Sequence, residues 1–66
     1  MKRNLMAEIS RNDIKKKEIA DHLHIGVDTF NDKLSGKSQF KLSEALEIHE
    51  TFFPGVDFLY LFAEIK

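Results

Sequence analysis

The chain has 66 residues, fewer than the usual domain size of about 100 to 150, so it has room for one small core. It contains no cysteine, which excludes a disulfide framework and a thiolate zinc site as supports for that core. Leu, Ile, Val and Phe nevertheless account for 21 residues, well above the roughly 20% below which a chain tends to remain disordered. We expect a single folded domain over residues 1–66.

The net charge of −1 hides an uneven distribution along the chain. Residues 1–17 carry a net +4, whereas residues 18–37 sum to −2 and residues 38–66 sum to −3. Because only the N-terminal third offers counterions for phosphates, any contact with nucleic acid must be local. No apolar run approaches the roughly 20 residues that span a bilayer, and Glu8, Arg11 and Asp13 interrupt the stretch that a signal peptide would keep apolar. We therefore expect a cytoplasmic protein without a membrane partner.

Apolar residues recur at three- and four-residue spacing in the first half of the chain, which predicts three short helices. The first ends near residues 12–13, the second is short, and the third spans roughly residues 27–35. Gly36 stands where a left-handed cap would end the third helix. The apolar stripes that define these helices are Leu5, Met6 and Ile9; Ile19, Ala20 and Leu23; and Val27, Phe30 and Leu34.

Two more helices are expected on either side of a turn at Pro54 and Gly55. The fourth stops at Phe53, because proline disfavours helical geometry in the residue before it. The fifth covers about residues 57–66 and begins at Asp57, a good N-cap residue. No strand-like alternation is present, so the predicted fold class is all-α, a compact bundle of about five short helices. The inward stripes are Leu42, Ala45, Leu46 and His49 for the fourth helix and Phe58, Leu61, Phe62 and Ile65 for the fifth.

The fifth helix is apolar over more of its circumference than one small core can bury. Leu59 and Tyr60 point away from its inward stripe. We therefore expect an interface with a second copy of the chain or with another partner. Its residues are Phe58, Leu59, Tyr60 and Phe62.

Residues 16–35 have the pattern of a helix-turn-helix, in which two short helices are separated by a tight turn. Ala20 has to be small because the following helix crosses closely over it. Residues 17–30 closely resemble the helix-turn-helix domains of the Cro/C-repressor type from bacteria and their phages. Residues 33–40, KLSGKSQF, resemble the KLNGKSEF run of small Gram-positive phage regulators. The resemblance covers about residues 5–53, and the tail from residue 52 to residue 62 also resembles the ending of such proteins.

This resemblance implies a transcriptional regulator, of the kind that controls a lysis-lysogeny switch, whose partner is a double-stranded DNA operator. The matching recognition helix is the third, with base-facing side chains at Val27, Asp28, Asn31 and Asp32. Asparagine can pair with adenine, valine can touch a thymine methyl group, and aspartate can accept from cytosine N4. The full expected contact set adds Thr29 on the same helix and the backbone-contacting residues Lys16, Lys17, Lys37 and Gln39.

The sequence also departs from the family pattern. His24 replaces a glycine common in the turn, Gly26 replaces the usual capping Ser or Thr, and Lys41 stands where a capping Thr often precedes Glu44. More seriously, Asp28 and Asp32 lie one turn apart on the expected DNA face, where the phosphate potential opposes them. The alternative function is therefore an antirepressor or modulator, which uses this acidic face to occupy the basic DNA-binding face of a cognate phage repressor.

Other classes of site find no support in the residue pattern. The three histidines, His22, His24 and His49, lack metal-ligand spacing on one helical face, so we expect no metal. No arrangement of nucleophile, base and orienting group can be recognised, so we expect neither an enzyme nor a cofactor or small-molecule ligand.

Overall fold

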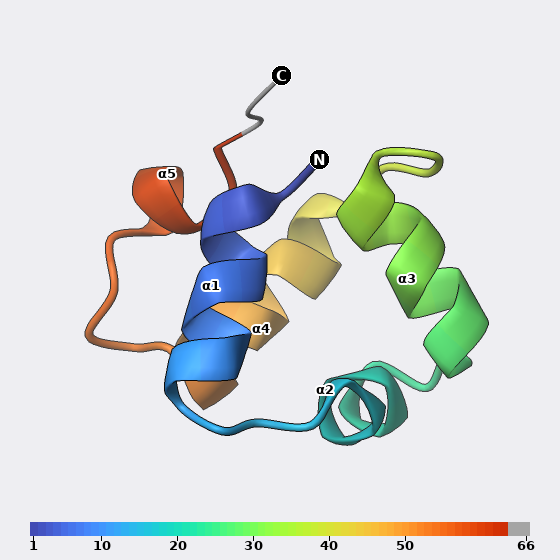
Figure 1. Cartoon of the computed structure of the whole chain (residues 1–66), viewed down its shortest axis with the longest axis horizontal. Helices are drawn as coiled ribbons and strands as arrows, with labels where there is room; N and C mark the ends of the chain where they lie inside the picture. Colours follow the sequence, from blue (N-terminus) through green and yellow to red (C-terminus); the bar gives the residue numbers. More distant parts are fainter. Residues whose placement is uncertain (64–66) are drawn as a thin grey trace.

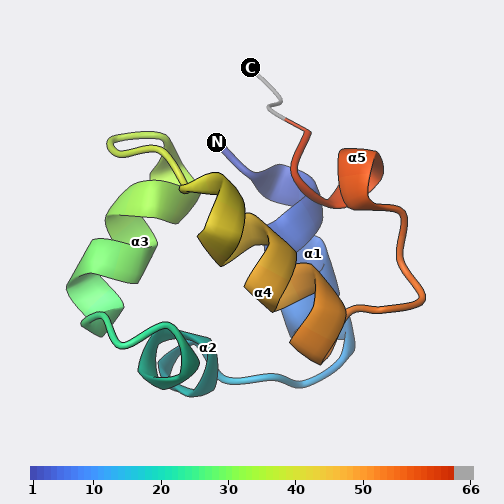
Figure 2. The ribbon, with the colours of Figure 1, turned by 180° about the vertical axis from the view of Figure 1, so that it is seen from behind.

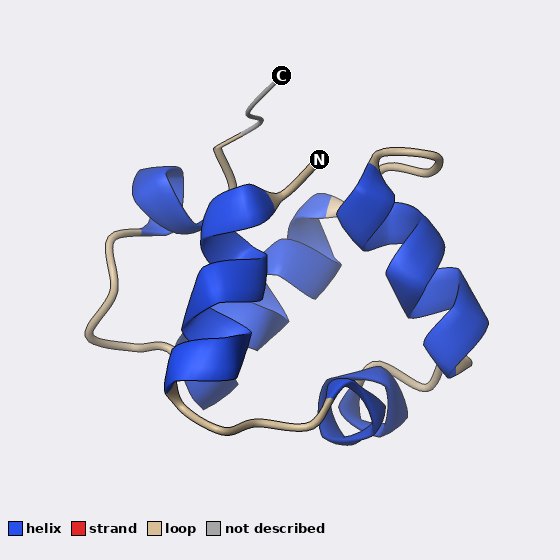
Figure 3. Cartoon of the chain, viewed as in Figure 1, coloured by secondary structure: helices blue, strands red, loops and turns tan. Residues whose placement is uncertain are grey.

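The structure, a computed structural model, describes residues 1–63. This part of the chain contains five α-helices joined by loops and no strand (Figure 3). The predicted all-α class is confirmed. Ile65, an expected core position, lies outside the described residues. The helices are α1 (Arg3–Arg11), α2 (Lys16–His22), α3 (Val27–Ser35), α4 (Leu42–Phe52) and α5 (Phe58–Leu61).

The five helices surround one hydrophobic core to which each of them contributes. α1 packs against both α3 and α5, and α2 packs against α3 (Figure 1). Seen from behind, α4 lies on the opposite side of the core from α1 (Figure 2). The core residues, each at most 5% exposed, are Leu5, Ile9, Ile19, Ala20, Phe30, Leu34, Ile48, Phe53 and Leu61.

The helix ends follow the local chemistry of the sequence. Gly36 ends α3 in the left-handed conformation, with φ of 94°, which glycine adopts without a steric penalty. Asp57 caps α5, because its carboxylate accepts a hydrogen bond of 2.9 Å from the backbone N–H of Tyr60. α4 ends at Phe52, one residue before the predicted stop at Phe53. The caps at Gly36 and Asp57 agree with the sequence-based expectations, and the end of α4 differs by one residue.

The inward face of α4 differs from the predicted stripe. Ala45 and Ile48 face the core, whereas Leu42 and Leu46 are 68% and 41% exposed. The helix is rotated because Glu44 turns inward to meet a buried lysine of α3, and Ile48 packs on the same side. The prediction that Leu42 and Leu46 belong to the core was therefore wrong.

α5 is one turn long, shorter than the helix predicted over residues 57–66. Its final carbonyl groups accept hydrogen bonds from the N-terminal segment instead of continuing the helix. The side chain of Asn4 donates to the carbonyl oxygen of Tyr60 at 2.9 Å, and the ammonium of Lys2 donates to that of Phe62 at 3.0 Å. Phe62 and Ala63 are therefore not helical.

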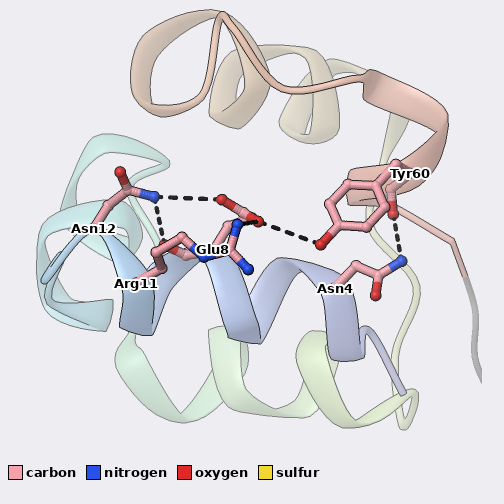
Figure 4. A network of polar contacts seen from close by, with 5 residues as sticks. All are labelled: Asn4, Glu8, Arg11, Asn12 and Tyr60. Atoms are coloured by element: carbon pink, nitrogen blue, oxygen red, sulfur yellow. Dashed lines mark hydrogen bonds and ion pairs between the residues drawn. The ribbon is translucent and has the colours of Figure 1, made fainter.

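A polar network centred on Glu8 ties α1 to α5 (Figure 4). Glu8 is only 4% exposed, and its Oε2 accepts from Arg11 at 2.9 Å and from the hydroxyl of Tyr60 at 3.3 Å. The side chain of Asn12 donates to the backbone carbonyl of Glu8 at 2.8 Å. Because each oxygen of this buried carboxylate has a donor within reach, the network stabilises the packing of α5.

Candidate functional site

α2 and α3 form a steeply crossed pair joined by a four-residue turn. In Figure 1, α2 is seen almost along its axis, while α3 runs across the view. Ala20 in α2 is fully buried, as expected for a residue over which the next helix crosses. The turn is fixed by backbone hydrogen bonds, from His24 to the carbonyl of Asp21 at 3.1 Å and from Ile25 to that of Ala20 at 3.0 Å. Residues 16–35 thus form two short helices joined by a tight turn, as their spacing predicts.

His24 adopts a left-handed backbone conformation in this turn, with φ of 60°. This region is favoured by glycine and is unfavourable for residues with a Cβ atom. The position where the sequence carries His24 in place of a common glycine is thus the position where the chain needs left-handed geometry. Gly26, by contrast, has an ordinary extended conformation, with φ of −76°, as N-cap of α3.

The outer side of α3 presents a row of polar side chains. Asp28, Thr29 and Asn31 are exposed. Asp32 is half-buried, and Val27 is half-buried because it packs against the core. The structure therefore places the four expected base-facing residues and Thr29 on one helix, and Asp28, Thr29 and Asn31 are freely accessible.

The expected backbone-contacting residues lie in the elements that precede and follow this helix. Lys16 and Lys17 are exposed at the start of α2, where Lys17 forms an ion pair of 2.9 Å with Asp21. Lys37 and Gln39 are exposed in the loop between α3 and α4. A surface pair of this kind is weak, so Lys17 can exchange its carboxylate partner for another anion at small cost.

Lys33 is the lysine of α3 that does not reach the surface. It is 8% exposed, and its ammonium lies 3.1 Å from Oε1 of Glu44 and donates to the carbonyl oxygen of Gln39 at 3.2 Å. Sequence reasoning missed this pair, although the position of Lys33 between Phe30 and Leu34 on the inward stripe was a usable signal. Because Lys33 pairs with Glu44 inside the protein, its positive charge does not balance the carboxylates of Asp28 and Asp32 on the outer side of α3.

The pKa of Glu44 reflects this environment. Burial alone would raise the pKa, but the backbone N–H of Lys41, which donates at 2.9 Å, and the ammonium of Lys33 outweigh it and hold the pKa below its ordinary value. Glu44 therefore remains ionised and fulfils half of a capping box at the start of α4.

A second polar cluster joins α2 to α4. His22 Nε2 lies 2.6 Å from Oε2 of Glu47, and Thr51 donates to the same oxygen at 3.2 Å. These hydrogen bonds, that from His22 first, lower the pKa of the Glu47 carboxyl. The cluster holds α2 against α4 and was not anticipated from the sequence.

The expected apolar interface on α5 is only partly exposed. Leu59 is 79% exposed and Tyr60 is 40% exposed, although its hydroxyl reaches Glu8. Phe58 and Phe62 are half-buried, and their ring centroids lie 5.1 Å apart. Phe62 also packs edge-on against Phe40 at 5.6 Å, so these two aromatic rings already have partners within the chain.

His22, His24, Glu44 and Glu47 line one hollow, yet no group of three or more His, Asp or Glu among residues 1–63 is arranged to hold a metal ion. Within the same range, none of the helices combines the length and the apolar character needed to cross a bilayer.

Comparisons with known proteins add no relatives. No protein-family model matches the sequence, and no curated protein or solved structure shows significant similarity to it. The interpretation of α2 and α3 therefore depends on their own residues and geometry.

Proposed function

We propose that the chain is a sequence-specific DNA-binding transcriptional regulator of the phage type. The observation that carries this proposal is the steep crossing of α2 and α3 over the buried Ala20, which leaves Asp28, Thr29 and Asn31 exposed along one helix. A helix held in this way can enter the major groove of DNA, where base edges differ in their donor and acceptor patterns.

In this proposal the exposed residues have separate tasks. Asn31 pairs with an adenine through both groups of its amide. Lys16, the first residue of α2, and Lys37, in the loop after α3, contact phosphates and set the position of the helix without reading sequence. Cytosine N4 is the base group that an aspartate can accept from, so Asp28 and Asp32 favour sites with cytosine at their positions.

The test is a comparison of specific and nonspecific DNA affinity for Asn31→Ala. We expect this variant to lose about 1 to 3 kcal/mol of discrimination between the operator and a scrambled duplex. Ser10→Ala, at an exposed position on α1, is the matched control and should retain full discrimination. If Asn31→Ala and Ser10→Ala discriminate equally well, Asn31 does not take part in base recognition.

A second function, capture of a cognate repressor, is supported by one specific observation. Asp28 and Asp32 lie on α3, while Lys33, the nearest cation in sequence, is neutralised inside the protein by Glu44. An acidic helix of this kind complements the basic DNA-binding face of a repressor.

One double variant separates the two functions. Asp28→Lys with Asp32→Lys should abolish capture of the repressor if the acidic face is the binding surface, and should strengthen attraction to DNA if α3 faces phosphates. Asp28→Asn with Asp32→Asn controls for the loss of negative charge alone. If neither repressor capture nor DNA affinity changes, both functions are contradicted.

A further inference from the structure

His22 is the residue through which the end of α2 meets α4. Its Nε2 atom lies 2.6 Å from Oε2 of Glu47 and 3.3 Å from the hydroxyl oxygen of Thr51. Its ring also packs edge-on against that of Phe52, with the ring centroids 5.6 Å apart. Three residues of α4 thus converge on the last residue of α2. We call His22, Glu47 and Thr51 the α2–α4 cluster.

The outer part of α2 depends on this cluster for its contact with α4. Ile19 and Ala20 are buried in the core, whereas the other residues of α2 are exposed. Within residues 1–63, every side-chain hydrogen bond between α2 and α4 is made by His22. A change in the strength of the cluster therefore changes how firmly α2 is held against α4.

The strength of the cluster depends on the charge of its histidine. Histidine is the side chain whose charge ordinarily changes between about pH 5 and 8. The hydrogen bonds from His22 and Thr51 lower the pKa of the Glu47 carboxyl below 4.5, so Glu47 is an anion throughout that range. An imidazolium forms an ion pair with this carboxylate, whereas a neutral imidazole offers it a hydrogen bond without the charge.

Other titratable groups surround His22 in the same hollow or on its own helix. They are Glu44, His24, Glu18 and Asp21. Glu44 and Asp21 already form ion pairs, with Lys33 and Lys17 respectively. The carboxylates of the set attract an imidazolium and so act in the same direction as Glu47. His24 is the other group of the set that ordinarily changes charge in this range, so a test has to separate its contribution from that of His22.

We propose that the α2–α4 cluster is a pH-sensitive switch that controls how firmly α2 is held against α4. When His22 gains a proton, the ion pair with Glu47 strengthens and α2 opens less often. When His22 loses the proton, the contact weakens and α2 opens more often. The two side chains are 39% and 51% exposed, so the effect is modest and is screened by salt. This proposal does not depend on DNA binding.

Hydrogen exchange of the backbone amides in the purified full chain, without DNA, tests the switch. The amide of Leu23 donates to the carbonyl of Ile19 at 3.0 Å, so its exchange reports the opening of the end of α2. After correction for the intrinsic pH dependence of exchange, we expect its protection to rise about threefold from about pH 7.5 to 5.5. Salt at about 1 M should remove most of this rise. The amides of α1, which carries no residue of the cluster, should not show it.

Two variants at exposed positions remove the switch in different ways. His22→Gln keeps a side-chain donor that cannot gain a charge, and Glu47→Gln removes the anion. Each should abolish the rise in protection of α2. His24→Asn is the matched control, because it removes the neighbouring imidazole while asparagine tolerates the left-handed backbone at this position. This variant should keep the rise.

Four results would overturn the proposal. One is a wild type in which the protection of α2 does not change with pH. Another is an equal rise in α1 and α2, which would show a change in global stability in place of a local opening. The third is a rise that persists in His22→Gln or in Glu47→Gln. The fourth is a rise that is lost in His24→Asn, which would assign the effect to the turn.

Discussion

The ammonium of Lys33 lies 3.1 Å from Oε1 of Glu44 and joins α3 to α4 beneath the surface of the protein. The same oxygen accepts the backbone N–H of Lys41 at 2.9 Å, and Lys33 also donates to the carbonyl of Gln39. One ion pair therefore fixes the end of α3, the loop that carries Lys37, and the start of α4. The positions of α3 and Lys37, which we propose contact DNA, therefore depend on this ion pair.

Removal of one member of the pair should destabilise the protein. Breaking a buried ion pair leaves an uncompensated charge and costs several kcal/mol, and because the two side chains remain 10% and 14% exposed we expect about 2 to 3 kcal/mol for Lys33→Met. Urea denaturation measures this loss. Lys17→Met breaks a pair whose side chains are 73% and 64% exposed and should cost less than about 1 kcal/mol. Equal losses in the two variants would contradict the role of Lys33.

Relief of the turn should stabilise the protein. His24 has φ of 60°, a conformation that costs a residue with a Cβ atom about 1 to 2 kcal/mol. Glycine would avoid this cost, but its greater freedom in the unfolded chain would cancel part of the gain. We expect His24→Gly to raise the free energy of unfolding by about 0.5 to 1 kcal/mol. His24→Ala, which removes the imidazole but keeps the Cβ atom, should bring no such gain. A thermal melt of the three proteins distinguishes strain in the backbone from an effect of the ring.

The sequence predicted the parts of the fold that depend on neighbouring residues. The two short helices of residues 16–35 with their tight turn, and the left-handed Gly36, follow from local spacing and backbone preference. The same holds for Asp57 as the cap of α5. These features need only a few consecutive residues, which is why they could be recognised without a structure.

Features that depend on distant residues were missed. The face of α4 was assigned from apolar spacing, but Glu44 turns inward to Lys33 and carries Leu42 outward. α5 was expected to be longer, but Asn4, 56 positions away in the sequence, takes the carbonyl of Tyr60. No local pattern reports such contacts, because their partners come together only in the folded chain.

The carboxyl of Glu47 should make the stability of the protein depend on pH. His22 and Thr51 lower its pKa in the folded state below the ordinary value of 4.5, so the stabilisation is present above that value and is lost as the pH falls through the folded pKa. Glu44, whose pKa is also lowered, acts in the same direction. We expect Glu47→Gln to lose stability less steeply than the wild type between neutral pH and the acid range.

The measurement is urea denaturation of wild type and variant at a series of pH values. Glu18→Gln, at an exposed position on α2, is the control and should follow the wild-type profile. Superimposable profiles for Glu47→Gln and the wild type would show that the contact with His22 does not contribute to stability.

The hydroxyl of Tyr60 should stabilise the docking of α5 on α1. It donates at 3.3 Å to Glu8, which is only 4% exposed, so Tyr60→Phe leaves a buried carboxylate with one donor fewer. We expect a loss of about 1 kcal/mol in the free energy of unfolding, measured by urea denaturation. Thr29→Val, which removes an exposed hydroxyl on α3, should cost less. If the Tyr60→Phe protein is as stable as the wild type, the hydroxyl does not contribute to stability, and Arg11 and Asn12 alone satisfy Glu8.

The central claim, that α3 and its flanking lysines bind DNA, is tested most directly by a fluorescence-anisotropy titration. The purified wild type is titrated with the duplex around its own gene's promoter and with a scrambled duplex, at about 50 and 200 mM salt. If Lys16, Lys17 and Lys37 neutralise three phosphates, the affinity should fall about 40-fold between the two salt concentrations, with the promoter preferred in both. No binding at the lower salt concentration, or an affinity that salt does not change, would contradict the claim and leave the acidic face of α3 as the binding surface.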